Sequence, residues 1–327
     1  MNKIVIITVL CAAGSLALVG CSKSKNGSTS SGGSNANGGG PAADLKVKWQ
    51  AGKRYDMEMD LNQSSDIAVP NRPINQVMKL TQGLHFSPLT NLDNGGSQVQ
   101  MEIDSQSLSF SQNGKELVSF DSNDSAPVPT NSAARPVAAV MRAMLNVPLV
   151  YTFGADGKVE SIDGTDVLVS RITTAMPNKQ QRAQLEQLFD QDTLKRYGQF
   201  SEGLPDHPVS PGDTWSSSQD INNATGVMTV DANYTFKDWE EHNGHHCAHL
   251  LITGDIKTKT ASAAMTGAKV TVKKGTITGD SWFDPDMGML VDLNSDQDLT
   301  MDIQTQAMTM TDRLKQNIKL SLVDVSP

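Results

Sequence analysis

The sequence has little of three things: cysteine, aromatic residues and positive charge. Aromatic residues make up 5% of its 327 residues, and the formal net charge is −9. Nucleic-acid-binding proteins carry clustered lysine and arginine, so an acidic chain without a basic patch is not expected to bind nucleic acid. The same charge balance argues against binding to anionic membrane surfaces. Fifteen methionines supply part of the apolar content that aromatic residues supply elsewhere.

The motifs that mark common catalytic sites are missing as well. The sequence contains no G-x-S-x-G nucleophile elbow, no H-E-x-x-H zinc motif, no phosphate-binding loop and no dinucleotide-binding fingerprint. Catalytic triads are assembled in space, so a missing motif weighs against an enzyme without excluding one. The sequence therefore favours a non-enzymatic protein without a cofactor, and an envelope hydrolase is the least favoured alternative.

The N-terminus predicts export. Lys3 precedes an apolar run, Ile4 to Leu18, that at roughly 15 residues is too short to span a bilayer comfortably. The run ends in Leu18-Val19-Gly20-Cys21, which resembles the bacterial lipoprotein signal. The resemblance implies that residues 1–20 are a signal peptide and that acyl chains on Cys21 anchor the chain in a membrane. Ser22 follows, and similarity to the sorting rule of Gram-negative lipoproteins implies the outer membrane, with the body in the periplasm or at the cell surface.

Only one cysteine is then left as a free thiol. Cys11 leaves with the signal peptide, Cys21 carries lipid, and Cys247 has no partner for a disulfide. Residues 21–45 follow as a lipidated cysteine and a flexible tether rich in serine and glycine.

The body is predicted to be all-β and antiparallel, with two related curved sheets or half-barrels and a few covering helices. Apolar and polar residues alternate in many runs, as half-buried strands require, and Asn-Gly pairs such as Asn94-Gly95 and Asn243-Gly244 mark turns between them. Helical spacing of apolar residues predicts helices near 136–146 and 178–198.

Landmarks that recur in the same order suggest an internal repeat. The Gly52–Tyr55 strand start corresponds to Gly212–Trp215, and the Asn94-Gly95 turn corresponds to Asn243-Gly244. The repeat predicts a first β-rich unit at 46–165, a helical connection at 166–203 and a second β-rich unit at 204–327. The alternative is that any all-β chain repeats its turn chemistry at short intervals.

Three short motifs resemble a family of uncharacterised bacterial lipoproteins, the DUF6263-like group. They are Pro208–Trp215 (PVSPGDTW), the Asp-Gly-Lys-Val turn at Asp156–Val159 and the Phe283-Asp284 turn. The resemblance covers most of residues 46–327 and implies no catalytic residues.

The densest group of side chains with metal-binding chemistry lies in residues 242–249. Strand alternation places His245, Cys247 and His249 on one face, where their nitrogen and sulfur atoms could bind zinc or copper. The spacing of same-face positions along one strand, about 6.5–7 Å, makes three consecutive ligands awkward. The alternative is a solvated turn that leads into a core strand with Cys247 buried.

Methionine-lined faces suggest an adaptable apolar surface, because the flexible thioether fits irregular ligands. The candidate ligand-binding residues are Met57, Met59, Met141, Met144, Met308 and Met310. The alternative is that these side chains fill the core between sheet and helix. From the sequence we expect either a binding module for an apolar ligand or lipid, or a structural or protein-interaction lipoprotein of the envelope.

Overall fold

The fold was analysed in a computed structural model, which describes residues 40–70, 72–124, 134–175, 189, 191–201, 203–223, 226–262 and 267–327. The predicted signal peptide and most of the predicted tether lie outside these ranges, as does most of the helix expected at 178–198. No helix among the described residues is long and apolar enough to cross a membrane.

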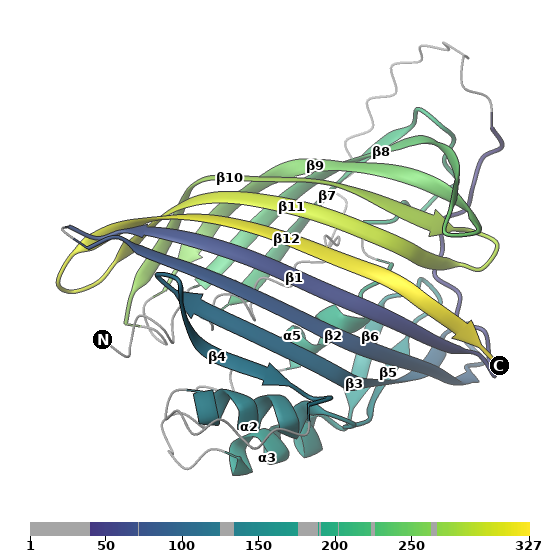
Figure 1. Ribbon diagram of the computed structural model, residues 1–327. Coiled ribbons are helices and arrows are strands. Elements are labelled where there is room, and N and C mark those ends of the chain that lie inside the picture. The colour runs from purple at the N-terminus through teal and green to yellow at the C-terminus, as the bar shows by residue number, and fades with distance from the viewer. Residues whose placement is uncertain are drawn as a thin grey trace.

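Twelve strands form one antiparallel sheet, which is curved and unclosed (Figure 1). The strands are β1 (Arg54–Ala68), β2 (Ile74–Asn91), β3 (Ser97–Gln112), β4 (Lys115–Asp121), β5 (Leu149–Phe153), β6 (Val159–Asp163), β7 (Thr214–Asn223), β8 (Gly226–His242), β9 (His245–Ala261), β10 (Lys269–Asp284), β11 (Met289–Gln304) and β12 (Thr309–Ser326). The prediction of an antiparallel all-β fold with few helices is confirmed.

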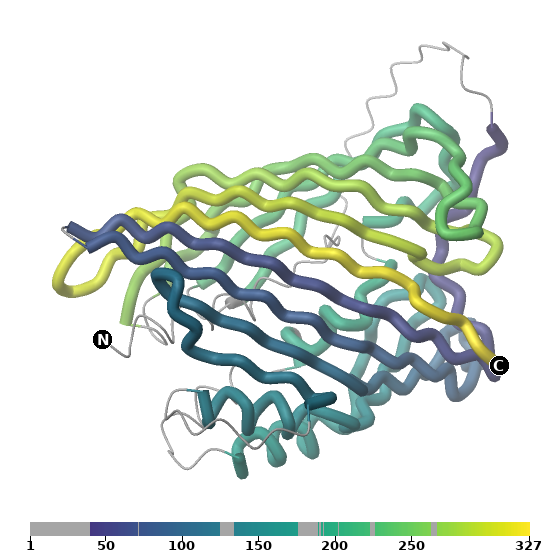
Figure 2. Tube along the Cα trace, in the orientation of Figure 1, coloured from purple at the N-terminus to yellow at the C-terminus, as the bar shows by residue number. Residues whose placement is uncertain are grey.

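The strand order is β6-β5-β3-β2-β1-β12-β11-β10-β9-β8-β7, with β4 paired to β3 outside this path. The first strand and the last therefore lie side by side at the centre of the sheet, as Figure 2 shows by their purple and yellow colours. The two predicted units thus belong to one continuous sheet that is joined through β12. Apart from β4 and β12, five strands of each predicted unit follow one another as neighbours, β1-β2-β3-β5-β6 and β7-β8-β9-β10-β11.

Among the described residues, four short helical segments accompany the sheet: α2 (Ala134–Met144), α3 (Thr165–Thr174), α5 (Gln191–Lys195) and the 3₁₀ helix η1 (Arg196–Gly198). α2 and α3 pack on one another beside β4 (Figure 1). α2 lies close to its predicted position, and its apolar residues Ala134, Ala138 and Met141 cover the buried face of β1 to β4. α3, α5 and η1 belong to the predicted helical connection.

Glycines on the buried face allow the sheet to curve. A Cβ atom on Gly254 would lie 2.2 Å from the Asp231 carbonyl oxygen of the neighbouring strand. On Gly279, it would lie 2.5 Å from the Asn294 carbonyl oxygen. Backbones of adjacent strands approach most closely where a sheet bends, and glycine permits this approach because it has no side chain.

Candidate functional site

The buried face of the sheet is its concave face, and alternation along the strands creates it. In β1, Tyr55, Met57 and Met59 are buried while Glu58 between the two methionines is exposed. The same alternation of buried and exposed residues continues on β11 and β12. The buried apolar residues form three clusters, the largest of which includes residues from both halves of the sheet. A surface of this kind is either the packed core of the protein or the lining of a binding site.

Aromatic side chains fill one end of the concave face. Trp49 comes from the segment before β1 and contacts Tyr55, Phe86, Phe153 and Phe200, with ring centroids 5.3–5.8 Å apart. The rings meet in stacked, tilted and edge-to-face arrangements that are favourable for aromatic pairs. This end of the concave face is therefore well packed.

Uncharged polar side chains occupy the middle of the concave face. Gln63 of β1 lies directly opposite Gln316 of β12, which lies opposite Gln297 of β11. Gln76 of β2 lies opposite Ser65, one row further along β1. We call Gln63, Gln76, Gln297, Gln316 and the neighbouring Ser295 the amide belt. All five side chains are at least 95% buried.

Several atoms of the amide belt have no hydrogen-bond partner in the structure. They are the Oε1 atom of Gln63, both amide atoms of Gln76, the Nε2 atom of Gln297 and the hydroxyl of Ser295. Most buried polar atoms in folded proteins are paired, because an unpaired donor or acceptor costs about 1–3 kcal/mol. A group of such atoms on one face of one sheet requires an explanation.

Other polar side chains on the same face are paired. Gln82 Nε2 donates to Gln106 Oε1 over 3.0 Å, and Gln106 Nε2 donates to the Met141 carbonyl oxygen of α2. Ser65 donates to Asp312 over 2.7 Å. Burial raises the pKa of Asp312; the Ser65 hydrogen bond opposes this shift. The concave face can therefore satisfy polar groups internally, and yet it leaves atoms of Gln63, Gln76, Gln297 and Ser295 without partners.

The methionines expected to line a binding surface divide into two groups. Five of them are buried: Met57, Met59, Met144 and Met310 in the main apolar cluster, and Met141 on the buried face of α2. Met308 lies before the start of β12 and is 43% exposed, so it does not share a face with Met310. The reason is that the chain turns at Thr305–Met308 before the strand begins.

The predicted metal ligands His245, Cys247 and His249 do share one face of β9, which is the outer face. Their side chains have separate neighbours, however. His245 Nδ1 lies 3.0 Å from Asp284 Oδ2. Cys247 is fully buried, and burial together with the charge of Asp284 raises the pKa of its thiol to about 12. A protonated, inaccessible thiol is a poor metal ligand.

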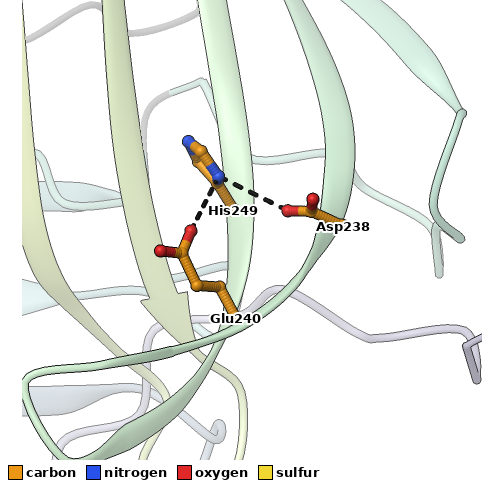
Figure 3. A group of neighbouring side chains, drawn as sticks. All are labelled: Asp238, Glu240 and His249. Carbon is orange, nitrogen blue, oxygen red and sulfur yellow. Dashed lines mark ion pairs between the residues drawn. The ribbon is translucent and has the colours of Figure 1, made fainter.

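His249 has a different set of neighbours, which sequence reasoning missed. Its Nδ1 atom lies 3.0 Å from Glu240 Oε2 and 3.4 Å from Asp238 Oδ1, both on β8 (Figure 3). Its Nε2 atom lies 2.7 Å from Asp280 Oδ1 on β10. The signal was available in the sequence: a two-residue turn at Asn243-Gly244 pairs His242 with His245, and counting back along both strands brings Asp238 opposite His249.

Comparison with known proteins places the chain in a family. Residues 94–290 match the family of unknown function DUF6263. The chain belongs to the DUF6263 family. This confirms the resemblance drawn from the short sequence motifs. The segment that matches DUF6263 contains His249 and its neighbours. It does not contain the four glutamines of the amide belt, Gln63, Gln76, Gln297 and Gln316. No curated protein matches the sequence.

Solved structures show only distant likeness. One match is lipovitellin, in a structure of its lipid–protein interactions, with 11% sequence identity and a TM-score of 0.48. The match covers 85% of this chain and 26% of lipovitellin. The chain therefore spans about a quarter of that protein's length. An exported protein with a YmcC-like fold from Bacteroides fragilis is 12% identical with a TM-score of 0.27; the match covers 86% and 99% of the two chains. These scores carry no conclusion about function.

Proposed function

We propose that this protein is a non-enzymatic, lipid-anchored envelope protein that binds an apolar or amphipathic molecule against the concave face of its sheet. The observation that carries the proposal is the amide belt, where buried amide and hydroxyl groups without partners interrupt an apolar surface. A face that served only as packed core would gain stability from apolar side chains at these positions.

The chemistry of the belt indicates the class of ligand. Gln76 offers both a donor and an acceptor, Gln63 offers an acceptor, and Gln297 offers a donor. None of these groups is charged, so the complementary polar part of the ligand is neutral, such as an ester, an amide or a hydroxyl. The surrounding apolar cluster complements hydrocarbon. A neutral amphipathic lipid combines both properties.

The residues that flank the belt are consistent with space for a ligand. Beyond Gln297, the same row continues through Ile277 of β10 to Gly254 of β9, Ala232 of β8 and Ser217 of β7. These three small residues add little side-chain volume to the concave face. The Ser217 hydroxyl is itself buried without a partner.

The anchor and the location complete the proposal. Acyl chains on Cys21 would hold the protein at a membrane, and the Ser/Gly-rich tether would allow the sheet to stand away from it. Ser22 after the anchor supports the outer membrane. A bound lipid would then lie close to the membrane that supplies or receives it.

The open edges of the sheet favour a second candidate, a protein-interaction lipoprotein. The sheet ends at β6 and β7, and an edge strand presents backbone groups that a partner strand can pair with. This candidate does not explain the unpaired amides, and for that reason it is placed second.

Native mass spectrometry with solvent extraction tests the proposal. The chain from Ser22 onward is exported behind a cleaved secretory signal and purified without detergent. Gln63→Met and Gln76→Met are compared with Glu58→Gln, which changes an exposed side chain on the outer face of β1. We expect a co-purifying neutral lipid that both belt variants retain less well than the control variant does. A ligand-free mass with a lipid-free extract would contradict binding and favour the interaction protein.

A further inference from the structure

The outer face of β8, β9 and β10 carries a second group of functional side chains. We infer that Asp238, Glu240 and His249 form a binding site for a divalent transition-metal ion. This site lies on the face opposite the amide belt and does not depend on the proposed ligand. No ligand atom is contributed by the predicted pair His245 and Cys247.

The local backbone brings the three side chains together. Asp238 and Glu240 are two positions apart on β8 and therefore point to the same face. The register set by the Asn243-Gly244 turn places Asp238 directly opposite His249, and a β-bulge between Phe236 and Asp238 follows at once on β8. Bulges commonly redirect side chains at functional positions. One ligand atom from each residue lies within 4.8 Å of the others.

The distances match those between ligands of one metal ion. Zinc binds nitrogen and oxygen ligands at about 2.0–2.2 Å, so two ligands of the same ion lie about 2.9–3.5 Å apart. The Nδ1 atom of His249 lies 3.0 Å from Glu240 Oε2 and 3.4 Å from Asp238 Oδ1 (Figure 3). Both separations fall inside this range.

The unpaired Nδ1 atom of His249 points to a bound ion rather than to ordinary hydrogen bonds. The side chain is 95% buried, and Nδ1 has no hydrogen-bond partner although two carboxylates lie close to it. Most buried polar atoms in folded proteins are paired. A cation held between Nδ1 and the two carboxylates would supply the missing partner.

Three further contacts hold the ligands in position. Nε2 of His249 lies 2.7 Å from Asp280 Oδ1. When Nε2 donates to this carboxylate, the lone pair of the neutral ring is on Nδ1, which is the usual carboxylate–histidine–metal arrangement. Trp282 Nε1 donates to Glu240 Oε2 over 3.0 Å, and this hydrogen bond is the main cause of the lowered pKa of Glu240. The indole of Trp282 also stacks on the His249 ring.

The donor set indicates the class of ion. One imidazole nitrogen and two carboxylate oxygens suit zinc or manganese better than calcium, which takes six to eight oxygen ligands. Asp238 and Glu240 are half-exposed, so water can supply the remaining ligands. The charge also favours a cation, because the carboxylates of Asp238, Glu240 and Asp280 surround the two ring nitrogens of His249.

Titration with Zn²⁺ by isothermal calorimetry tests the inference. The full chain is stripped with EDTA and compared with Glu240→Gln, Asp238→Asn, His249→Gln and Asp280→Asn. The control is His207→Gln, because His207 is exposed, pairs with Asp206 and is not one of the clustered residues. We expect one Zn²⁺ per chain, at least tenfold weaker binding in the three ligand variants and unchanged binding in the control.

Asp280→Asn tests the positioning role separately. This variant keeps every proposed ligand and removes the negative charge of the outer hydrogen-bond acceptor, and mutation of such a partner typically weakens a metal site about 10–100-fold. Co²⁺ absorption then reports whether a nitrogen ligand is still bound. Stoichiometric Zn²⁺ binding that is unchanged in Glu240→Gln and Asp238→Asn, both of which are surface substitutions that should fold, would overturn the inference. Absence of a binding event in the parent chain would overturn it as well.

Discussion

Two glutamines on the same face of β2 provide a direct test of the amide belt. Gln76 and Gln82 are both at least 98% buried. Gln76 has no partner for either amide atom, whereas Gln82 donates to Gln106 and accepts from the Tyr197 hydroxyl at 3.4 Å. Methionine has nearly the same shape as glutamine and no amide, so Gln76→Met and Gln82→Met make the same chemical change in two different environments.

The structure gives opposite signs for the two changes. Gln76→Met removes a desolvated amide without breaking a bond and should raise the free energy of unfolding by about 1–3 kcal/mol. Gln82→Met leaves the Oε1 atom of Gln106 without its donor and should lower the free energy of unfolding by about 1–3 kcal/mol. The two variants should therefore differ by about 2–6 kcal/mol, which corresponds to at least about 4 °C in melting temperature for a chain of this size.

Urea unfolding followed by tryptophan fluorescence measures both effects, on protein from which bound lipid has been extracted. In the presence of ligand, the increase in the free energy of unfolding caused by Gln76→Met should become smaller, because ligand binding stabilises the parent chain more than the variant. A loss of stability in lipid-free Gln76→Met would refute the reasoning, since it would mean that the amide already has a partner. Equal effects in both variants would refute it too.

Three further predictions concern single residues. Burial and the charge of Asp284 raise the pKa of the Cys247 thiol to about 12. This thiol should therefore react with Ellman's reagent at pH 8 only after unfolding. Fast reaction in the native protein would contradict its burial. Burial raises the pKa of Asp312 above its ordinary value, so the free energy of unfolding should fall as pH rises from about 4. In Asp312→Asn, the free energy of unfolding, measured with urea between pH 4 and 8, should depend less on pH. This variant should also be more stable than the parent at neutral pH. Gly254→Ala should lose about 1–3 kcal/mol in the same assay, because its Cβ atom would contact the Asp231 carbonyl oxygen; an unchanged midpoint would contradict this.

The fold was largely predictable because period-two alternation is strong in these strands. Tyr55, Met57 and Met59 identify the buried face of β1, and the Asn243-Gly244 turn, with φ angles of 52° and 81°, fixes the β8–β9 hairpin. The pairing of β1 with β12 could not be predicted. Both strands alternate well enough to pair with several partners, and the contact joins residues more than 200 positions apart, so local sequence does not select it.

The candidate sites were predictable only in part, for the same physical reason. In β1, Gln63 and Ser65 occupy positions where alternation calls for apolar residues, and this irregularity is visible in the sequence. The row that Gln63 forms with Gln316 and Gln297 depends on the register between β1, β12 and β11, which no local pattern specifies. The neighbours of His249, in contrast, follow from one hairpin and could have been found by counting back from its turn.

Strand alternation also separates the two proposed sites, which lie on opposite faces of one sheet. On β10, Ser281 and Ile277 face the concave side while Asp280 and Trp282 face outward beside His249. Successive side chains point to opposite faces, so a substitution at one site leaves the side chains of the other unchanged. Glu240→Gln should therefore abolish tight Zn²⁺ binding and leave lipid retention intact, and Gln76→Met should do the reverse. If one variant impaired both activities, the two faces would be coupled through the backbone of the sheet, which would have to adopt two arrangements.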